Sequence, residues 1–320
     1  MPNRLTSLRI DSVRDFNQIE LFRLYRQVDS TRSFKVRSAP TIWRAPVSLL
    51  LMASTVQPSS LGFAGYADLP GVRLWYTDSG SRGVPVILLH ANTGNADGWQ
   101  HNIPAFVEGR YRVITFDRRG WGRSTANRDT GTQPGTIAED LHALADHLQL
   151  ERFHLVGVAG GGYAAYDYVL WHPERLRSVV IAASGGGIVD EELGKLRQKT
   201  RLPGFESWPA EFREVSMGYM ATNPDGLQRW LEIHHHSQQQ GAPVQPQRAT
   251  ITYESLATIR VPTLLMPGDQ DLLTPPWVMR RQLAHIPGAR FVVLPEAAHS
   301  INWEQPEAFN RNVLEFIDRH

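Results

Sequence analysis

The sequence predicts an α/β protein with a mostly parallel central sheet, flanking helices and an inserted helical cap. Three observations carry this prediction. Short, almost continuously apolar runs recur from residue 84 onward, segments with helical spacing separate them, and one long interval lacks strand-like runs. Apolar runs of this length are typical of strands buried on both faces, as in a parallel sheet between helices.

Length and composition set the limits of this prediction. The chain has 320 residues, of which 42% are hydrophobic and 20% charged, so it can form one large α/β domain with a substantial core. A formal net charge of +1 argues against a nucleic-acid partner. The chain has no cysteine, which excludes disulfides, thiolate metal ligands and a cysteine nucleophile. No apolar run reaches 18 residues, so we expect no stable membrane insertion.

The first part of the chain differs from the rest. We predict that residues 1–61 are an N-terminal extension that is disordered or removed by processing. Residues 1–50 contain nine Lys/Arg against four Asp/Glu, and "WRAPVSLLLMAS" (43–54) has the basic flank and short apolar run of a targeting peptide. The acidic residues weigh against that interpretation. We therefore expect a cytoplasmic protein, with export or an organelle as the alternative if residues 1–54 act as a targeting segment.

The orderly part of the chain begins with two alternating segments. "FAGYADL" (63–69) and "GVRLWYTDSG" (71–80) flank Pro70, which predicts a β-hairpin. The buried strands are predicted at 84–90, 112–117, 153–158, 178–184, 262–268 and 290–296. The helices are predicted at 136–150, 163–176, 275–286 and 306–319. Alternation of strands and helices predicts a layered α/β sheet.

One interval interrupts this alternation. Residues 188–248 contain no strand-like run and carry helical stretches rich in Trp, Phe, Met and Tyr. We predict that they form a helical cap, inserted between a first core part at 62–187 and a second at 249–320. A polar loop at 237–247 returns the chain to the core.

Three sites at predicted strand ends carry side chains or turns suited to chemistry. In "GVAGG" (157–161) a strand enters a sharp turn before a helix, and such a turn needs small neighbours because its central residue, Ala159, is strained and its side chain is pushed up from the sheet. Asp271 follows a buried strand in "MPGDQDLLTPP". His299 follows the last strand in "PEAAHSINWEQP".

The chain order of these sites is turn, acid, histidine. From about residue 62 the sequence resembles the α/β-hydrolase superfamily in its cap-bearing branch. The resemblance rests on five motifs: "LLHANTG" (88–94), "FDRRGWGRS" (116–124), the turn at 157–161, "GDQD" (268–271) and "AAHSINWEQPEAF" (297–309). It implies the same fold that the strand and helix pattern predicts.

The resemblance also implies roles for individual residues. His299 would be the general base, and Asp271 would orient it and stabilise the imidazolium. Backbone N–H groups of Gly160 and of Ala91 or Asn92 would form the oxyanion hole. The sequence departs from the family pattern twice. Ala91 stands where glycine usually follows the histidine, and Ala159 stands where the family has its nucleophilic serine.

Several other residues have competing interpretations. Asp269 is a rival to Asp271, but we expect it to cap the turn after Gly268. His90 is assigned to the substrate pocket or to fixing a loop, and Ser184 is an alternative hydroxyl that we expect to cap a turn. Four cap residues are assigned to the substrate pocket or to simple packing: Trp208, Met217, Met220 and Trp230.

No cofactor or metal is expected. His234, His235 and His236 resemble a metal-binding run, but consecutive residues of a helix point to different faces. The sequence contains no other candidate cluster of ligands.

Ala159 decides which functions stay open. Loss of the serine closes the covalent acyl-enzyme route, at a cost on the order of a millionfold in turnover. We predict a cofactor-independent hydrolase of an ester, lactone, amide or carbamate, in which His299 activates water and the substrate is a small molecule. The alternatives are a lyase, an isomerase, a cofactor-free oxygenase, or a catalytically silent binding protein. The sequence leaves open whether Ala159 is natural or a Ser→Ala substitution, and it indicates no oligomeric state.

Overall fold

A nine-stranded sheet forms the centre of the fold in the computed structural model, which describes residues 62–242 and 244–320. The strand order is β1-β2-β4-β3-β6-β7-β8-β9, and β5 pairs with β2. From β4 to β9 every pair of neighbouring strands is parallel. The predicted fold class is therefore confirmed. The N-terminal extension predicted at residues 1–61 lies outside the described residues.

The strands agree closely with the apolar runs of the sequence. They are β1 Phe63–Leu69, β2 Val72–Asp78, β3 Pro85–Leu89, β4 Arg112–Phe116, β5 Thr125–Ala126, β6 Phe153–Val158, β7 Leu176–Ala182, β8 Thr263–Met266 and β9 Arg290–Phe291. β1 and β2 form the predicted antiparallel hairpin, with Leu69 opposite Val72. The predicted strand at 290–296 is shorter, because beyond Phe291 only single contacts continue beside β8, such as the bridge between Gly268 and Leu294.

Helices cover both faces of the sheet. They are α2 Ile103–Glu108, α3 Ile137–His147, α4 Gly160–Trp171, α5 Glu191–Thr200, α6 Ala210–Glu214, α7 Met217–Thr222, α8 Pro224–His235, α9 Tyr253–Leu256, α10 Pro276–Leu283, α11 Ile301–Glu304 and α12 Pro306–Ile317. Short 3-10 turns lie at η1 Ala96–Trp99, η2 Pro173–Arg175 and η3 Phe205–Ser207. Over the described residues, none of these helices combines the length and the apolar character that crossing a bilayer requires.

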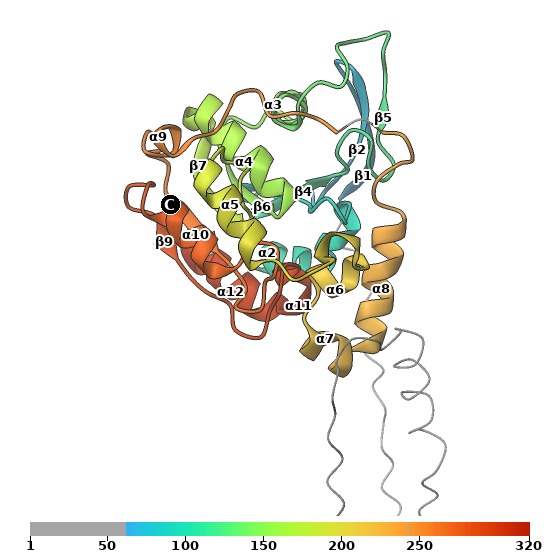
Figure 1. The fold of residues 1–320 in the computed structure, drawn as a ribbon. Helices are drawn as coiled ribbons and strands as arrows, with labels where there is room; N and C mark the ends of the chain where they lie inside the picture. The colour runs from blue at the N-terminus through green and yellow to red at the C-terminus, as the bar shows by residue number, and fades with distance from the viewer. Residues whose placement is uncertain (1–61, 243) are drawn as a thin grey trace, which may run out of the picture. The chain divides into compact units, whose positions relative to one another are not determined.

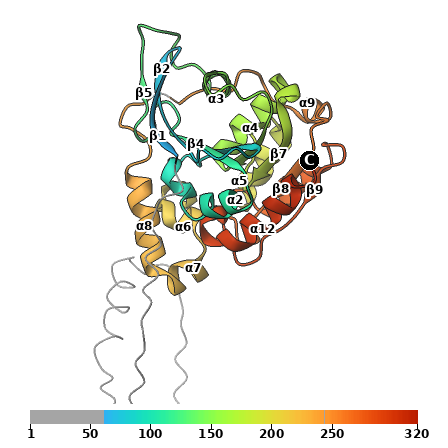
Figure 2. The ribbon, with the colours of Figure 1, turned by 180° about the vertical axis from the view of Figure 1, so that it is seen from behind.

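Successive residues of the central strands point to opposite faces of the sheet, and this builds two cores. Ile87 and Leu155 pack with residues of α3, α4 and α10. Val86 and Val156 pack with residues of α2 and α12 on the other face. Figure 1 views the sheet from the α4 side, and Figure 2 shows α2 and α12 in front of it. Burial on both faces explains why these strands read as continuous apolar runs.

Between β7 and β8 the chain forms helices α5 to α9 and, within the described residues, no strand. Both views show α6, α7 and α8 grouped together beside the sheet (Figures 1 and 2). Ala210 of α6 and Trp230 of α8 share a small apolar cluster with Trp303 of α11. The limits of the predicted cap, residues 188 and 248, stay a prediction.

A buried ion pair ties three segments of the core together. Arg119, after β4, donates from Nε and Nη2 to the two carboxylate oxygens of Asp140 on α3, at 3.1 and 2.6 Å. Its other hydrogen bonds reach the carbonyl oxygens of Pro70 and Thr132. Both side chains are only 4% exposed. A bidentate pair with its remaining donors satisfied is the arrangement in which burial of two charges is tolerated.

Replacing Arg119 with Met would leave the Asp140 carboxylate buried without its partner. We expect the free energy of unfolding to fall by about 3–5 kcal/mol, measured by urea unfolding followed by tryptophan fluorescence. The control is Arg73→Met, because the Arg73–Asp68 pair is largely exposed and pairs of that kind contribute little. Equal midpoints for the two variants would contradict the structural role of the buried pair.

Candidate active site

The carboxyl ends of β6, β7 and β8 meet at one edge of the sheet, and ligand sites of open α/β sheets gather at that edge. Ala159 follows β6, Ala183 follows β7 and Asp271 follows β8. A cavity of about 200 Å³ opens there, and its lining includes Ala159, Ala183 and His299. The structure thus brings residues that are 140 positions apart in the chain to one place.

Ala159 has an unusual backbone conformation, with φ 51° and ψ −112°. A non-glycine residue at positive φ is strained by about 1–3 kcal/mol and stays there only if its surroundings hold it. The N–H of Ala159 donates to the carbonyl oxygen of Ala182 at 2.9 Å. Its own carbonyl oxygen accepts the Ser184 hydroxyl at 2.6 Å. Ser184 therefore supports the turn, and it also lines the cavity.

Backbone segments around the turn pack so closely that they leave no room for a side chain at two glycines. A Cβ on Gly157 would lie 2.5 Å from the carbonyl oxygen of Gly161. A Cβ on Gly161 would overlap the carbonyl oxygen of Leu89 on the neighbouring strand. Glycine is needed at these two positions because β3, β6 and α4 pack against one another through bare backbone.

Replacing Gly161 with Ala should force β3 and α4 apart. We expect a loss of about 1–3 kcal/mol in the free energy of unfolding, as for other overpacked sites. The matched control is Gly194→Ala on α5, where a Cβ meets no atom within 4 Å and a gain of about 0.4–1 kcal/mol is expected. Chemical unfolding of both variants gives the comparison, and a harmless Gly161→Ala would contradict the close packing.

His299 and Asp271 contact each other directly. His299 Nδ1 lies 2.8 Å from Asp271 Oδ2. The other carboxylate oxygen, Oδ1, accepts the N–H groups of Leu273 and Thr274, each at 2.8 Å. Asp269 instead lies near the N–H of Ala297, at 3.4 Å. Of the two candidate acids, the structure brings Asp271 to His299.

The surroundings of His299 change its affinity for a proton. Burial disfavours the charged imidazolium, but the charge of Asp271 and its hydrogen bond outweigh burial, and the pKa of His299 is raised above 6.5. A second carboxylate fixes the loop. Glu304 accepts the N–H of Ala298 at 3.1 Å and the N–H of Ser216 at 2.8 Å. Burial raises the pKa of Glu304.

A pH titration followed by NMR of the His299 imidazole should show a midpoint above 6.5. Asp271→Asn removes the charge that raises this pKa, so the midpoint should move to lower pH. Because only the neutral imidazole accepts a proton, any step that uses His299 as a base should be lost as the pH falls through this midpoint. An unchanged midpoint in the Asp271→Asn variant would contradict the coupling.

The loop after β3 borders the cavity through Asn92. Asn92 and Gly160 both line the cavity of His299, whereas Ala91 lines a separate small cavity together with His90 and Trp230. Asn92 approaches the turn closely, because its backbone nitrogen lies 3.2 Å from the position of a Cβ on Gly160. Of the two residues predicted to supply the first N–H, Asn92 is the one in the described lining of the His299 cavity. Its role in an oxyanion hole stays a prediction.

His90 fixes its own loop. Its Nδ1 lies 2.7 Å from the carbonyl oxygen of Ala91, and its Nε2 accepts the N–H of Arg118 at 3.1 Å. Burial and the nearby charge of Arg118 lower the pKa of His90 well below 6.5, so the imidazole is neutral. His90 is absent from the lining of the His299 cavity.

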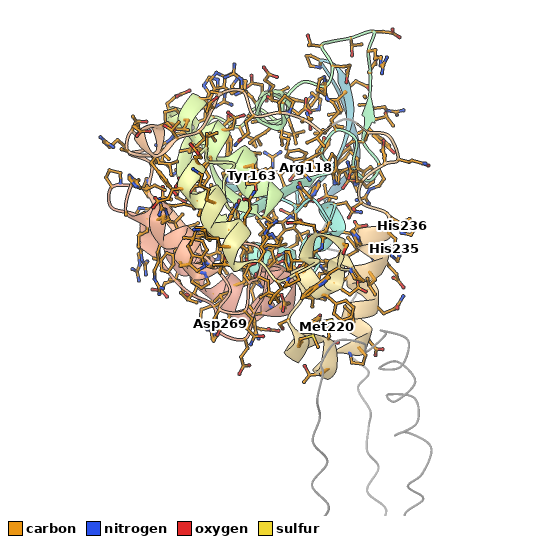
Figure 3. All side chains as sticks on the ribbon, in the orientation of Figure 1. Arg118, Tyr163, Met220, His235, His236 and Asp269 are labelled. Atoms are coloured by element: carbon orange, nitrogen blue, oxygen red, sulfur yellow. The ribbon has the colours of Figure 1, made fainter. Side chains whose placement is uncertain are left out.

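The four cap residues assigned to the pocket lie elsewhere. Met217 is 69% exposed, and Trp208 packs on Phe205 with ring centroids 5.3 Å apart. Trp230 donates to the Ser300 hydroxyl at 3.1 Å. Figure 3 shows Met220 on α7, away from Tyr163, which borders the cavity. None of the four therefore lines the cavity of His299 in the described part of the chain.

The lining of the cavity instead includes three arginines. Arg197 and Arg201 lie four residues apart along the chain, Arg197 on α5 and Arg201 directly after it, and Arg213 lies on α6; all three line the cavity. The Nε atoms of Arg197 and Arg213 are buried and have no hydrogen-bond acceptor. Burial and then the charges of Arg197 and Arg213 lower the pKa of Arg201. Glu214 is the one carboxylate in the described lining, and it accepts the Thr93 hydroxyl.

Sequence reasoning missed these arginines because it looked for apolar residues in the cap. The spacing of Arg197 and Arg201 was a usable signal, since residues four apart share one side of a helical segment. Arg213 carried no such signal. In the described part of the chain no group of three or more His, Asp or Glu side chains is placed to hold a metal ion. His235 is the last residue of α8 and His236 follows it, at the edge of the view in Figure 3.

The fold and the site can now be compared with known proteins. The sequence profile of the alpha/beta hydrolase family matches residues 86–312. The chain belongs to this family. A 2-hydroxy-6-oxononadienedioate/2-hydroxy-6-oxononatrienedioate hydrolase from Burkholderia vietnamiensis is 29% identical over 264 residues, which cover 78% of this chain and 92% of the relative.

Solved structures agree. The enol-lactonase from Burkholderia xenovorans LB400 is 26% identical, has a TM-score of 0.67, and is matched over 79% of this chain and 99% of its own. A thermophilic esterase from Thermogutta terrifontis, 24% identical with a TM-score of 0.65 over 80% of this chain and 99% of its own, shows the shared fold. These relatives are named as a hydrolase, an enol-lactonase and an esterase.

Proposed function

We propose that this alpha/beta hydrolase is a hydrolase that acts on a carbonyl compound bearing a carboxylate, with His299 as general base and no covalent intermediate at Ala159. The observation that carries the proposal is the composition of one cavity. It combines the His299–Asp271 pair, the strained turn at Ala159 and three arginines. Cofactor-free hydrolysis of an ester, lactone, amide or carbamate is the reaction that these groups support.

The proposed reaction runs in two steps. His299 Nε2 takes a proton from a water molecule while the water oxygen bonds to the carbonyl carbon. The electron pair of the C=O bond moves to its oxygen, and the N–H groups of Gly160 and Asn92 stabilise the oxyanion. The carbonyl then re-forms, the bond to the leaving group breaks, and His299 returns the proton to that group. Asp271 stabilises the imidazolium between the two steps.

Ala159 fits such a water-dependent route. The side chain at this position lies in the cavity but has no oxygen, so no acyl group can be transferred to it. The strained backbone is nevertheless retained, and it holds the N–H of Gly160 at the start of α4. The turn thus keeps its proposed oxyanion function while the nucleophile comes from solvent.

The arginines support an anionic substrate. Three partly buried guanidinium groups and one glutamate line the cavity. Arg201 contacts Glu206, but the buried Nε atoms of Arg197 and Arg213 have no acceptor, and a buried donor without an acceptor is costly unless a ligand pairs with it. Guanidinium groups bind carboxylates with well-defined geometry. The name of the Burkholderia vietnamiensis relative, a dicarboxylate hydrolase, agrees with this substrate class. The enol-lactonase is named for a lactone, one of the proposed kinds of substrate.

The test compares hydrolysis of p-nitrophenyl acetate with that of the mono-p-nitrophenyl ester of succinate. The unaltered chain should prefer the succinate ester. His299→Ala should lower kcat for both by about 10²–10⁴-fold, the usual contribution of a general base. The control His235→Ala, at an exposed residue that ends α8, should change nothing. Arg213→Gln should raise KM for the succinate ester about tenfold or more and leave the acetate ester unchanged.

Two further results separate this proposal from a disarmed serine enzyme and from a binding protein. Turnover that arises only in Ala159→Ser, together with labelling of that variant by a fluorophosphonate probe, would contradict the water route. Tight binding of succinate without turnover in any variant would favour a catalytically silent receptor.

A further inference from the structure

A second cavity lies beside the one that holds His299. It has a volume of about 170 Å³ and shares Asn92, Gly160 and Tyr163 with the first cavity. Figure 3 shows Tyr163 close to Arg118, which lines the second cavity, in the interior of the described fold. The shared residues form the boundary between the two cavities, so a single elongated ligand is able to contact both.

Arg118 is a buried cation without a carboxylate partner among the described residues. It is 2% exposed, and burial alone lowers the pKa of its guanidinium to about 9. Nη2 donates to Asn92 Oδ1 at 2.9 Å and to the carbonyl oxygen of Ala91 at 3.3 Å. Nε is buried and has no acceptor. The charge of Arg118 is therefore met only by neutral groups.

The next residue along the chain shows the contrast. Arg119 is buried to a similar extent but reaches both carboxylate oxygens of Asp140. An unpaired buried charge costs far more than a paired one. Groups in so unfavourable a state are found preferentially in clefts that bind ligands. Arg118 lies in such a cleft, whereas Arg119 lies between core segments.

The rest of the lining suits an acid on an apolar chain. The ring of Trp121 lies against the Arg118 guanidinium, 4.5 Å from its carbon. Ile137 provides an apolar wall. One carboxylate, Asp167, also lines the cavity, and it accepts the backbone N–H of Arg248 at 2.8 Å. Burial raises the pKa of Asp167, which disfavours its negative charge. Arg118 is the one cationic side chain of the described lining.

We propose that the Arg118 cavity is a second carboxylate subsite of the active site. Its ligand is one end of a dicarboxylate whose other end meets the arginines of the first cavity and whose reacting carbonyl lies at Ala159. That the ligand is a substrate rests on the proposed function. That the cavity binds a carboxylate does not, because binding is measured without turnover.

The test is calorimetric titration of the full chain with straight-chain α,ω-dicarboxylates of five to nine carbons and with the monocarboxylates of equal length. We expect at least one dicarboxylate to bind about tenfold or more tightly than its matched monocarboxylate, as expected for one added hydrogen-bonded charge pair. Arg118→Gln should remove this difference and leave the affinity for the monocarboxylate within about twofold. Arg118→Lys should retain part of it.

A second variant keeps the test sound if Arg118→Gln does not fold. Ile137→Trp adds bulk to the lining of the same cavity at a residue that takes no part in the hydrogen bonds of Arg118, and it should also remove the preference for the dicarboxylate. A purely structural Arg118, which only holds Ala91 and Asn92, would weaken binding of both acids equally in Arg118→Gln and leave Ile137→Trp unaffected.

The outcomes are distinct. The subsite is overturned if no dicarboxylate of the series binds better than its monocarboxylate, or if the preference survives in both Arg118→Gln and Ile137→Trp. If the preference exists and depends on Arg118 while no ester is hydrolysed by any variant, the subsite stands and the proposed function fails. If esters are hydrolysed without such a preference, the proposed function stands and the subsite fails.

Discussion

The close approach of bare backbone at the β6–α4 turn is the constraint on which the site depends. Gly157 and Gly161 let β6 and α4 pack against the Leu89 carbonyl of β3, and the chain can make this turn only by placing Ala159 at positive φ. The strain is met by hydrogen bonds from the ends of β7 and from Ser184. The turn therefore fixes the positions of three groups at the carboxyl edge of the sheet: the Gly160 N–H, the Ala159 side chain and the Asn92 loop.

Alanine at position 159 is compatible with this geometry, because none of the hydrogen bonds that hold the turn comes from the side chain at that position. The Ala159 N–H and carbonyl oxygen carry them instead. His299 is likewise held without a contact from position 159. Its Nδ1 contacts Asp271, and the carboxylate of Asp271 accepts two backbone N–H groups of its own loop. The turn and the His299–Asp271 pair are thus supported by different interactions, so alanine at position 159 disturbs neither of them.

Both cavities at the carboxyl edge of the sheet are lined by arginines. Arg197, Arg201 and Arg213 line one cavity and Arg118 the other, whereas elsewhere in the described core a buried arginine such as Arg119 has its carboxylate. Low-dielectric surroundings strengthen the attraction of a cation for an anion. Arg201 contacts Glu206, whereas the buried Nε atoms of Arg118, Arg197 and Arg213 have no acceptor. These unmatched donors are the basis of the proposed preference for anionic small molecules, which needs no strong net charge on the whole chain.

The amino-acid sequence by itself determined the fold class, the hairpin, most of the strands and helices, and the identity of the loops that follow β6, β8 and the last strand. It could do so because burial on both faces and helical spacing are local patterns of apolar residues. The family resemblance indicated Asp271 rather than Asp269 as the partner of His299, and the structure shows that contact. Only the tertiary structure decided that Asn92 rather than Ala91 borders the cavity, and that arginines rather than Trp208 or Met217 line it. Those outcomes depend on which residues, far apart in the sequence, come together around one cavity. A local pattern of apolar residues does not specify such contacts.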